Sequence, residues 1–583
     1  MKLSDYVFKF LNERGINTVF YLPGGGCMHL LDSLGVNKGI NAVSLLHEQA
    51  VAVACESYSN TTGTPGAALV TTGPGGTNTV TGVLASYLDS VPCFFISGQV
   101  KTTDLKGRFG VRGHGSQEAD IVSIVSSITK YAVMVTDKDS IRYHLEKAWH
   151  EMTNGRRGPV WLDIPLDIQG SQIEPKSLDG FTPEDIKSPT LDISEIIHAL
   201  NNSKRPIIIA GNGLVSCKEK FFDLINLLQI PIIPTWKTMD YIPNSHPLYA
   251  GRAGGMGDRH GNLTMQNADF LLCLGSRLDF SITGFDRSKW AVKAAKFIVD
   301  IDANEISKLE GANNIVPIIA DVEDVIDALS AKKNEITLFD ISGWKNKIVE
   351  WKSKYPLTVT GDKLTTYHFI NELCKQLPEG AYIAPCSSGT TAEIFFQAFN
   401  VKMKQKIRSN HGLGAMGFEV PNAIGMCIGS GLKDVVCIAG DGGMQLNIQE
   451  LAIIRGRNLP IKIFVINNSG YASIRNMQNN NFEKRHIGCD FGSGLFLPET
   501  SALASAYSLP YFRTDKNETL LETIRDALNT TGPVVCEIVV DTECFLSLRT
   551  ATKIFPDGSL RSSPLENQFP FLPEDEAEAN ILQ

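Results

Sequence analysis

Residues 435–467 contain two short apolar runs that end abruptly on polar residues, and this unit constrains the fold more than any other stretch. The run VVCIA stops at Gly440-Asp441-Gly442, and the run IKIFVI stops at Asn467-Asn468. Both runs are rich in β-branched residues, which is typical of buried parallel strands. The segment between them, MQLNIQELAIIRGRN, has helical spacing of its apolar residues. We therefore predict a right-handed strand–helix–strand crossover with two parallel strands.

The polar residues that follow these strands form a candidate ligand site. Asp441 and Asn468 would lie at carboxyl ends of parallel strands, where open α/β sheets bind ligands. Their side-chain oxygens and the main-chain carbonyl near Gly470 are hard donors of the kind that magnesium prefers. Gly442 lets phosphate approach the backbone, and a helix opening at Gly443 would offer free amides to an anion. The pattern predicts a magnesium-bound diphosphate, although GDG alone is also common turn chemistry.

The length and the composition shifts of the chain predict several domains. At 583 residues the chain is too long for a single core. Segments of alternating strands and helices cover residues 1–170, 190–335 and 355–550, and a polar, proline-bearing stretch between the first two has the character of a linker. The remaining residues, 551–583, form a polar tail. The expected fold class is therefore α/β, with three doubly wound domains, each built on a parallel sheet.

Charge and cysteine usage exclude several classes of protein. Lys plus Arg number 54 against 63 Asp plus Glu, a net charge of −9 without a basic run, so nucleic acid is not an expected partner. No apolar stretch is long enough to span a membrane, and the first residues lack the hydrophobic core of a signal peptide. The twelve cysteines contain no CxxC pair, which favours reduced, buried thiols in a cytoplasmic protein over disulfides or zinc ligands.

A family resemblance extends the interpretation of the GDG and NN pair. Their spacing resembles the cofactor motif of thiamine diphosphate enzymes, which also need an N-terminal glutamate. Glu48 in the segment SLLHEQAVAVACESYS is the candidate. A glutamate at the start of a helix more often serves only to interact favourably with the helix dipole. Further matching segments occur in the same order as in one branch of these enzymes, the acetolactate synthases (acetohydroxyacid synthases). They are YLPGGG, TTGPGGTNTVTGVLASYLDSVPCFFISGQ, GSQEADIVSIVSSITKY, GRRGPVWLDIPLDIQ and GLGAMGFEVPNAIG.

The resemblance implies roles for individual residues. Asp441, Asn468 and the Gly470 carbonyl would be the magnesium ligands, and Glu48 would hydrogen-bond the aminopyrimidine ring and activate the cofactor. Gln117 matches the active-site glutamine of the family. Met416 would support the bent form of the cofactor. Gly389 and Thr390 of SSGTT would contact its diphosphate, although SSGTT departs from the residues usual in the family. The other residues expected to contact the cofactor follow the strand: Gly442, Gly443 and Met444.

The family also implies partners and a second cofactor. Because its glutamate and its diphosphate site come from different subunits, a homodimer or tetramer is expected. Its middle domain binds FAD, and GSRLDFSITG with VDIDANEISKL resembles that region, with Arg277 near the dinucleotide. Ser281 stands where a second arginine is usual, and GGMGDRHGN departs from the usual glycine loop, so the sequence leaves FAD open.

The leading functional hypothesis is a carboligase that decarboxylates pyruvate and transfers the two-carbon acyl unit to a carbonyl acceptor. A simple 2-oxo acid decarboxylase, with His114 as proton donor, is the alternative enzyme. A non-catalytic paralogue is a third possibility, but such a protein would be expected to lose Glu48 or Asp441, and both are present.

The acceptor is the least determined part of this hypothesis. Where branched-chain synthases have a bulky tryptophan, the nearest residue is Met477, and the segment that follows resembles a subgroup acting on nucleotide-bound keto-sugars. A smaller side chain there would open the pocket. Four basic residues would then be available to a sugar or its diphosphate, unless they form a solvated loop: Arg475, Lys484, Arg485 and His486.

Overall fold

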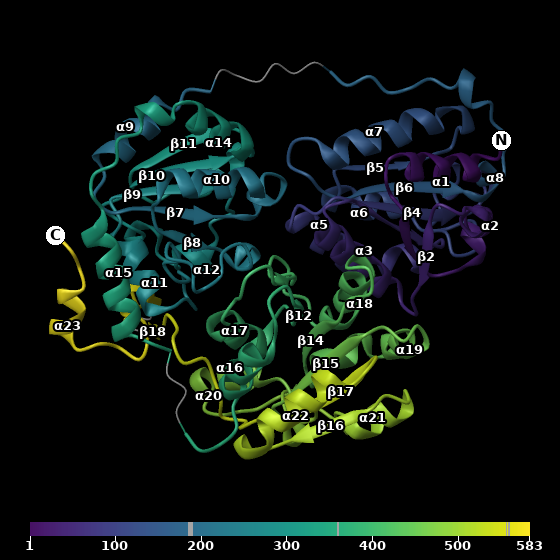
Figure 1. Cartoon of the computed structure of the whole chain (residues 1–583). Helices are drawn as coiled ribbons and strands as arrows, with labels where there is room; N and C mark the ends of the chain where they lie inside the picture. Colours follow the sequence, from purple (N-terminus) through teal and green to yellow (C-terminus); the bar gives the residue numbers. More distant parts are fainter. Residues whose placement is uncertain (185–190, 358–360, 555–556, 558–559) are drawn as a thin grey trace.

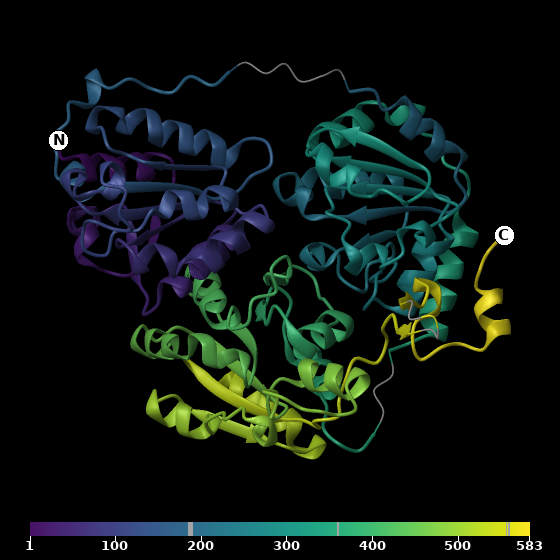
Figure 2. The same ribbon diagram turned by 180° about the vertical axis from the view of Figure 1, so that it is seen from behind.

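The computed structural model describes residues 1–184, 191–357, 361–554, 557 and 560–583. Three separate parallel sheets, each flanked by helices on both faces, confirm the predicted fold class of three doubly wound α/β domains (Figures 1 and 2). The linker residues 185–190 and part of the predicted tail, 555–556 and 558–559, lie outside the described residues.

The N-terminal domain contains a six-stranded parallel sheet in the order β2-β1-β3-β4-β6-β5. Its strands are β1 (Thr18–Tyr21), β2 (Asn41–Ser44), β3 (Gly66–Val70), β4 (Cys93–Gln99), β5 (Tyr131–Met134) and β6 (Val160–Pro165). Its helices are α1 (Leu3–Glu13), α2 (Met28–Val36), α3 (Glu48–Thr62), α4 (Pro74–Thr77), α5 (Val80–Leu88), α6 (Ile121–Val125), α7 (Ile141–Thr153) and α8 (Leu166–Gln169). The four central strands, β1, β3, β4 and β6, have largely apolar sequences because they are buried on both faces.

The central domain contains a five-stranded parallel sheet in the order β11-β10-β9-β7-β8. Its strands are β7 (Pro206–Ala210), β8 (Ile232–Pro234), β9 (Phe270–Leu274), β10 (Ala295–Asp300) and β11 (Ile315–Ile319). Its helices are α9 (Ser194–Asn202), α10 (Lys218–Leu228), α11 (Arg259–Asn267), α12 (Phe280–Thr283), α13 (Ala303–Ser307), α14 (Val322–Ala331) and α15 (Ser342–Lys354). Because α15 buries Trp344, Ile348 and Trp351 in this core, we propose to extend the domain beyond residue 335.

The third domain contains a six-stranded parallel sheet in the order β13-β12-β14-β15-β17-β16. Its strands are β12 (Tyr382–Pro385), β13 (Lys406–Ile407), β14 (Val435–Gly440), β15 (Ile461–Asn467), β16 (Tyr511–Thr514) and β17 (Val534–Val539). Its helices are α16 (Thr366–Gln376), α17 (Gly389–Ala398), α18 (Glu419–Gly429), α19 (Leu451–Gly456), α20 (Ala472–Asn481), α21 (Thr500–Ala506) and α22 (Asn517–Asn529).

The crossover predicted from the two apolar runs is present, with one correction. Strands β14 and β15 are adjacent and parallel, with Gly440 opposite Ile466. However, the segment between them does not begin with a regular α-helix at Gly443. It begins with a 3₁₀ helix, η11 (Gly443–Glu450), which is kinked at Asn447, and the α-helix starts only at Leu451. The amide of Asn447 donates to Gly417 and Gln49 (2.8 and 3.0 Å), so neighbouring segments override the helical pattern here.

The polar tail returns to the central domain. It contains the strands β18 (Thr552–Ile554) and β19 (Leu560–Ser562) and the helix α23 (Glu574–Ala579), and it ends beside α15 (Figure 1). The Asn580 side chain accepts a hydrogen bond from Trp351 Nε1 (2.8 Å), and Arg259 donates to the carbonyl of Pro570 (2.6 Å). The tail thus joins the third domain to the central one.

The N-terminal and third domains meet through two closely packed helices, α3 and α18. Gly425 on α18 lies so near α3 that an added Cβ would come within 2.2 Å of the Ala54 carbonyl oxygen. Beside this contact the Ser57 hydroxyl donates to the Asn422 carbonyl (2.7 Å). A glycine is therefore required at position 425 for the two domains to approach this closely.

We predict that Gly425→Ala weakens this domain contact, because the new methyl group meets a backbone carbonyl that cannot move freely. The expected loss of stability is about 1–3 kcal/mol, measured by chemical unfolding together with protease susceptibility. Gly343→Ala is the matched control, since it is also helical but its added Cβ would meet nothing within 4 Å. Equal stability of the two variants would contradict the close contact.

Candidate functional site

The carboxylate of Asp441 is buried where β14 ends. It accepts hydrogen bonds from the backbone amides of Gly442 and Gly470, each at 2.9 Å. Burial raises the pKa of Asp441 to about 6, although these two amides and the charge of Arg475 oppose the shift. The side chain of Asp441 therefore bridges the ends of β14 and β15, as the parallel arrangement predicts.

Asn468 supplies a second oxygen beside this carboxylate. Its Oδ1 atom is buried and has no hydrogen-bond partner among the described residues. A buried carbonyl oxygen without a donor is costly unless another group satisfies it. The Asp441 carboxylate after β14 and the unsatisfied amide oxygen after β15, whose loop contains Gly470 with a φ of +117°, are donors that suit a hard cation.

Two glycines of this site are required by close packing. An added Cβ at Gly442 would lie 2.4 Å from the Tyr471 ring, and one at Gly470 would lie 2.4 Å from the carbonyl oxygen of Cys489. Gly443 instead faces the side chain of Glu419, with 3.0 Å between its added Cβ and Oε1. The backbone around Asp441 is therefore packed closely against Tyr471 and Cys489.

Gly389 and Thr390 begin helix α17 in the same domain. Gly389 has a φ of +80°, and the nearest atom to an added Cβ is the Ser473 hydroxyl of α20, at 3.9 Å. Thr390 is buried. The start of α17 therefore faces the helix that follows the Asn468–Gly470 loop, so SSGTT and the Asp441 site lie on one side of the sheet.

The two methionines predicted to contact the cofactor differ in their surroundings. Met416 is 36% exposed, next to Gly417, whose carbonyl accepts a hydrogen bond from Asn447. Met444 is 1% exposed and belongs to the apolar core shared by the N-terminal and third domains. The side chain of Met416 is therefore available to a ligand, whereas that of Met444 is packed within the protein.

Glu48 opens helix α3, as predicted, and its carboxylate accepts a hydrogen bond from the side-chain amide of Asn78 (3.0 Å). The neighbouring residues touch η11 of the same chain, since Leu46 N donates to Glu450 (3.0 Å). Within the described residues of the single chain, no hydrogen bond joins Glu48 to Asp441 or Asn468.

Gln117 and His114 lie on an exposed loop of the N-terminal domain. Gln117 has a φ of +63°, and its carbonyl lies 2.3 Å from where an added Cβ on Gly73 would be, so glycine is required at position 73. The backbone amide of His114 donates to Glu118 (2.7 Å), and its ring lies 4.7 Å from that of Phe109. These surroundings are those of a surface residue, and they give no support to a catalytic role for His114 as a proton donor.

The four basic residues after the NN pair do not form one exposed group. Lys484 and Arg485 are exposed, and Arg485 pairs with Glu483 at 3.5 Å. Arg475, in contrast, is only 5% exposed and donates to the carbonyl of Asn468 (2.8 Å). The prediction that Arg475 is free to receive a sugar is therefore wrong, because its guanidinium is used inside the protein.

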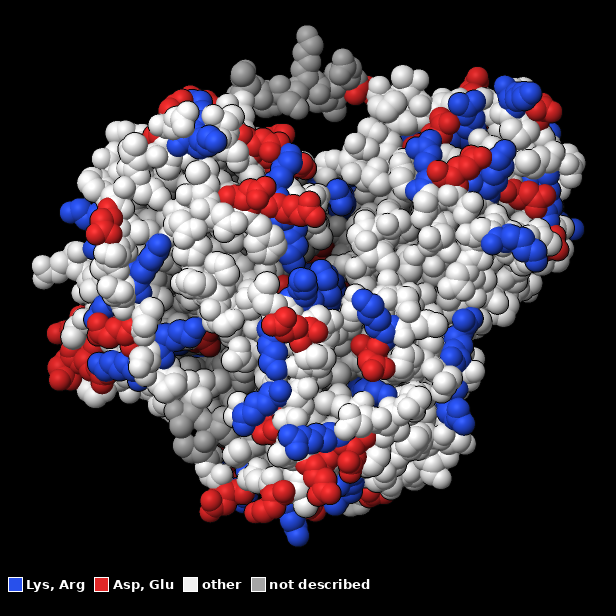
Figure 3. Space-filling view, in the orientation of Figure 1, with Lys and Arg blue, Asp and Glu red and all other residues white. Residues whose placement is uncertain are grey.

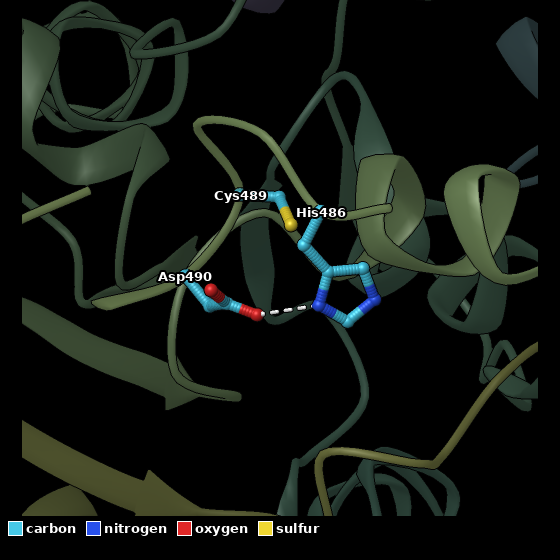
Figure 4. Close-up of side chains that lie close together, drawn as sticks. All are labelled: His486, Cys489 and Asp490. Atoms are coloured by element: carbon cyan, nitrogen blue, oxygen red, sulfur yellow. Dashed lines mark ion pairs between the residues drawn. The ribbon is translucent and has the colours of Figure 1, made fainter. Parts of the chain in front are cut away.

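His486 belongs to a tightly bonded turn in the same loop. Its Nδ1 lies 3.1 Å from Asp490 Oδ2, and Cys489 is directed toward the same point (Figure 4). Ligand atoms of His486, Cys489 and Asp490 lie within 4.8 Å of one another. The sequence did not predict this group. Both nitrogens of His486 already have protein partners, Asp490 and Asn479 (2.7 Å), so the group explains the stability of the turn without an ion.

Comparison with known protein families agrees with this geometry. The chain matches three family models: the thiamine pyrophosphate enzyme N-terminal TPP binding domain at residues 1–124, the central domain at 193–329, and the C-terminal TPP binding domain at 387–538. The chain belongs to the thiamine pyrophosphate enzyme family.

Curated relatives define the branch of this family. The acetolactate synthase large subunit of Lactococcus lactis is 30% identical over 548 residues, which are 92% of each chain. The chloroplastic acetolactate synthase 3 of Brassica napus is 30% identical over 553 residues, covering 92% of this chain and 83% of the relative. The resemblance predicted from the sequence motifs is confirmed: this is an acetolactate synthase-like thiamine pyrophosphate enzyme.

All three domains of the enzyme line one cavity of about 770 Å³. Its lining includes Ser90 and Arg156 of the N-terminal domain, Arg277 of the central domain, and Ser388 and Gly389 of the third domain. Arg277 pairs with Asp279 (3.0 Å). On the face shown in Figure 3, charged side chains of both signs gather in the hollow between the N-terminal and central domains.

A buried carboxylate joins the three domains beside this cavity. Asp89 follows α5 and accepts hydrogen bonds from Lys237 Nζ of the central domain and from the Asn410 amide of the third domain, each at 2.7 Å. Asn212 also donates to the Asp89 carbonyl (3.0 Å). Asp89 therefore links all three domains beside the cavity that they line.

Two buried side chains near the site were missed by sequence reasoning. His411 lines the cavity between the rings of Trp236 and Phe396, and burial lowers its pKa to about 3. Glu419 lies beside Gly443, and burial raises its pKa to about 7. Both belong to or adjoin the GLGAMGFEVPNAIG motif, but nothing in the sequence shows that they are buried.

We predict that Glu419→Gln stabilises the enzyme at high pH. Because the folded-state pKa (about 7) exceeds the ordinary value of 4.5, ionisation of Glu419 costs stability progressively as the pH rises from 4.5 to 7. The amide variant should therefore be more stable than the wild type at pH 8, by on the order of a few kcal/mol, and similar to it below pH 4.5. Unfolding midpoints measured across this range test the prediction, and a pH-independent difference would contradict it.

The described residues include no helix with the length and apolar character needed to cross a membrane.

Proposed function

We propose that the enzyme is a carboligase that decarboxylates pyruvate and transfers the two-carbon acyl unit to a carbonyl acceptor, using thiamine diphosphate and magnesium. The observation that carries this proposal is the burial of the Asp441 carboxylate and of the unsatisfied Asn468 Oδ1 atom at the ends of the adjacent strands β14 and β15. The acetolactate synthase names of its relatives support the reaction class.

The residues present fit a magnesium-bound diphosphate. Asp441 and Asn468 offer side-chain oxygens, and Gly470 offers a main-chain carbonyl, at one end of the sheet. Gly442 and Gly443, with Gly389 and Thr390 at the start of α17, would contact the diphosphate through backbone groups. The burial of Met444 limits its contribution to its backbone.

Thiamine diphosphate, when bound, supplies the electron sink that decarboxylation of a 2-oxo acid requires. Glu48 would hold a proton at the aminopyrimidine ring, and Asn78, which donates to Glu48, orients its carboxyl group. Met416, which is 36% exposed, would support the bent form of the cofactor. Gln117, on its exposed loop, would contact the substrate.

The acceptor is proposed to be bulkier than pyruvate, such as a nucleotide-bound keto-sugar. Met477 is 40% exposed on α20, so a flexible side chain, and not a rigid indole, is accessible at this position. Lys484 and Arg485 are exposed in the following loop and can attract phosphate groups. Formation of acetolactate from two pyruvate molecules would be a slower side reaction.

The family resemblance supports a proposal for the assembly, and the state of the cysteines supports one for the compartment. We propose a homodimer or tetramer, because the family resemblance implies that Glu48 of one subunit meets the Asp441 site of another. All twelve cysteines are free and eleven are buried, which supports a reducing compartment such as the cytoplasm.

The decisive experiment incubates the enzyme with pyruvate, magnesium and thiamine diphosphate, with and without nucleotide-bound keto-sugars, and identifies the products by mass. We expect a two-carbon branched sugar to form faster than acetolactate, and Glu48→Gln to retain less than about a tenth of the activity because an amide cannot shuttle the proton. Efficient pyruvate self-condensation with no turnover of any keto-sugar would overturn the proposed acceptor.

A matched variant separates acceptor choice from chemistry. Met477→Trp should narrow the entrance, so it should lower the keto-sugar rate relative to the rate of acetolactate formation. Release of acetaldehyde by the wild type, without either condensation product, would instead favour a simple decarboxylase.

We further propose that the 770 Å³ cavity binds FAD. Its volume falls in the range of about 300–1,000 Å³ that cofactor pockets occupy. Gly213 and Gly275 belong to the cavity lining and pack against each other, with 2.6 Å from the Gly213 Cα to an added Cβ on Gly275, so glycine is required at position 275. Arg277 supplies a positive charge for a diphosphate, although Ser281 replaces the second arginine of the family.

If this proposal holds, the purified enzyme is yellow, and Arg277→Ala weakens flavin retention by about tenfold, since it removes a charged hydrogen-bond donor. Arg287→Ala is the control, because Arg287 lies in the same domain but outside the cavity lining and donates to Lys308. Flavin absorbance of the purified protein and equilibrium dialysis against FAD measure the flavin retention of both variants. A colourless, fully active enzyme that takes up no flavin would exclude FAD.

A further inference from the structure

The guanidinium of Arg475 is buried directly behind the loop that carries Asn468 and Gly470. Its Nη2 atom donates to the carbonyls of Asn468 (2.8 Å) and Thr542 (3.0 Å), and its Nη1 atom donates to the carbonyl of Ser469 (3.3 Å). Arg475 is 5% exposed, so these bonds lie away from water. A single side chain thus holds two consecutive carbonyls of the loop and one carbonyl beyond β17.

The loop that Arg475 holds has an unusual backbone. Ser469 has a φ of +61° and Gly470 a φ of +117°, so two consecutive residues adopt conformations that non-glycine residues rarely occupy. Such a conformation costs free energy and persists only where surrounding contacts impose it. The hydrogen bonds from Arg475 to the carbonyls of Asn468 and Ser469 supply such contacts from the interior. On the other side of the loop, the Cys489 carbonyl accepts a hydrogen bond from Tyr471 N (2.9 Å).

Electrostatics adds to this role. The positive charge of Arg475 attracts both Asp441 and Asp490, the two carboxylates on either side of the loop. A buried guanidinium without an ion-pair partner at hydrogen-bond distance would be costly unless carbonyl dipoles satisfied it. Asn468, Ser469 and Thr542 provide those dipoles.

We propose that Arg475 is a positioning residue that fixes the Asn468–Gly470 loop in the conformation in which Asn468 and Gly470 can bind magnesium together with Asp441. This inference rests on the proposed magnesium and thiamine diphosphate site. Arg475 itself does not touch the cofactor or the substrate. Its substitution acts through the loop, so it lowers the affinity for the magnesium complex before it changes any chemical step.

The test measures binding of thiamine diphosphate by calorimetry at several magnesium concentrations, without turnover. Arg475→Met removes all three bonds and should weaken magnesium-dependent binding by about tenfold or more. Arg475→Lys keeps the charge and one donor group, so its affinity should fall between those of Arg475→Met and the wild type. Asp441→Ala, which removes the charged ligand, should abolish the binding.

Arg259 provides the matched control. It is also buried (4% exposed) and donates to two backbone carbonyls, those of Gln568 and Pro570, but it lies in the central domain next to the tail. Arg259→Met should lower the unfolding midpoint as Arg475→Met does, yet leave the affinity for the magnesium complex unchanged. The comparison separates a general loss of stability from a specific loss of loop geometry.

Each outcome decides between these roles. Unchanged affinity in Arg475→Met, or equal losses in the Arg475 and Arg259 variants, would overturn the positioning role while leaving the proposed site intact. If Arg475→Met does not fold, Arg475→Lys carries the test, and an affinity within about twofold of the wild type would overturn the proposal. Wild-type enzyme without magnesium-dependent binding would overturn both this inference and the proposed function.

Discussion

The interaction on which the site depends is the burial of one carboxylate, that of Asp441, between the ends of two parallel strands. A buried charge is costly unless hydrogen bonds and nearby positive charge compensate it. Here the compensation comes from the amides of Gly442 and Gly470 and from the field of Arg475. Among the described residues Asn468 Oδ1 has no hydrogen-bond donor, so this oxygen remains available to a ligand at the same end of the sheet.

A few specific contacts also fix the arrangement of the three domains. Apolar packing between the domains is supplemented by close backbone approach and by hydrogen bonds. The helix pair α3 and α18 approaches through Gly425, and Asp89 collects donors from the central and third domains at a single buried point. The large cavity lies at this junction, so its shape depends on how the domains are held. A ligand bound there would contact all three domains at once.

The tail and the loop after α20 show how peripheral segments contribute to this order. The tail crosses to the central domain and satisfies buried groups such as Trp351 Nε1. The turn formed by His486, Cys489 and Asp490 stabilises the loop that covers Gly470. The tail is ordered by hydrogen bonds to partners far away in the sequence, whereas the turn is ordered by bonds to neighbours in its own loop.

The sequence by itself determined the fold class, the crossover and the positions of Asp441, Asn468 and Glu48, because strand periodicity and local spacing are properties of adjacent residues. Only the tertiary structure decided that η11 is a kinked 3₁₀ helix, that Met444 is core, and that Arg475 supports a loop instead of facing an acceptor. It also showed how His411 and Glu419 are buried. Each of these depends on contacts between segments distant in the chain, and burial and donor–acceptor pairing across such distances leave no pattern in the local sequence.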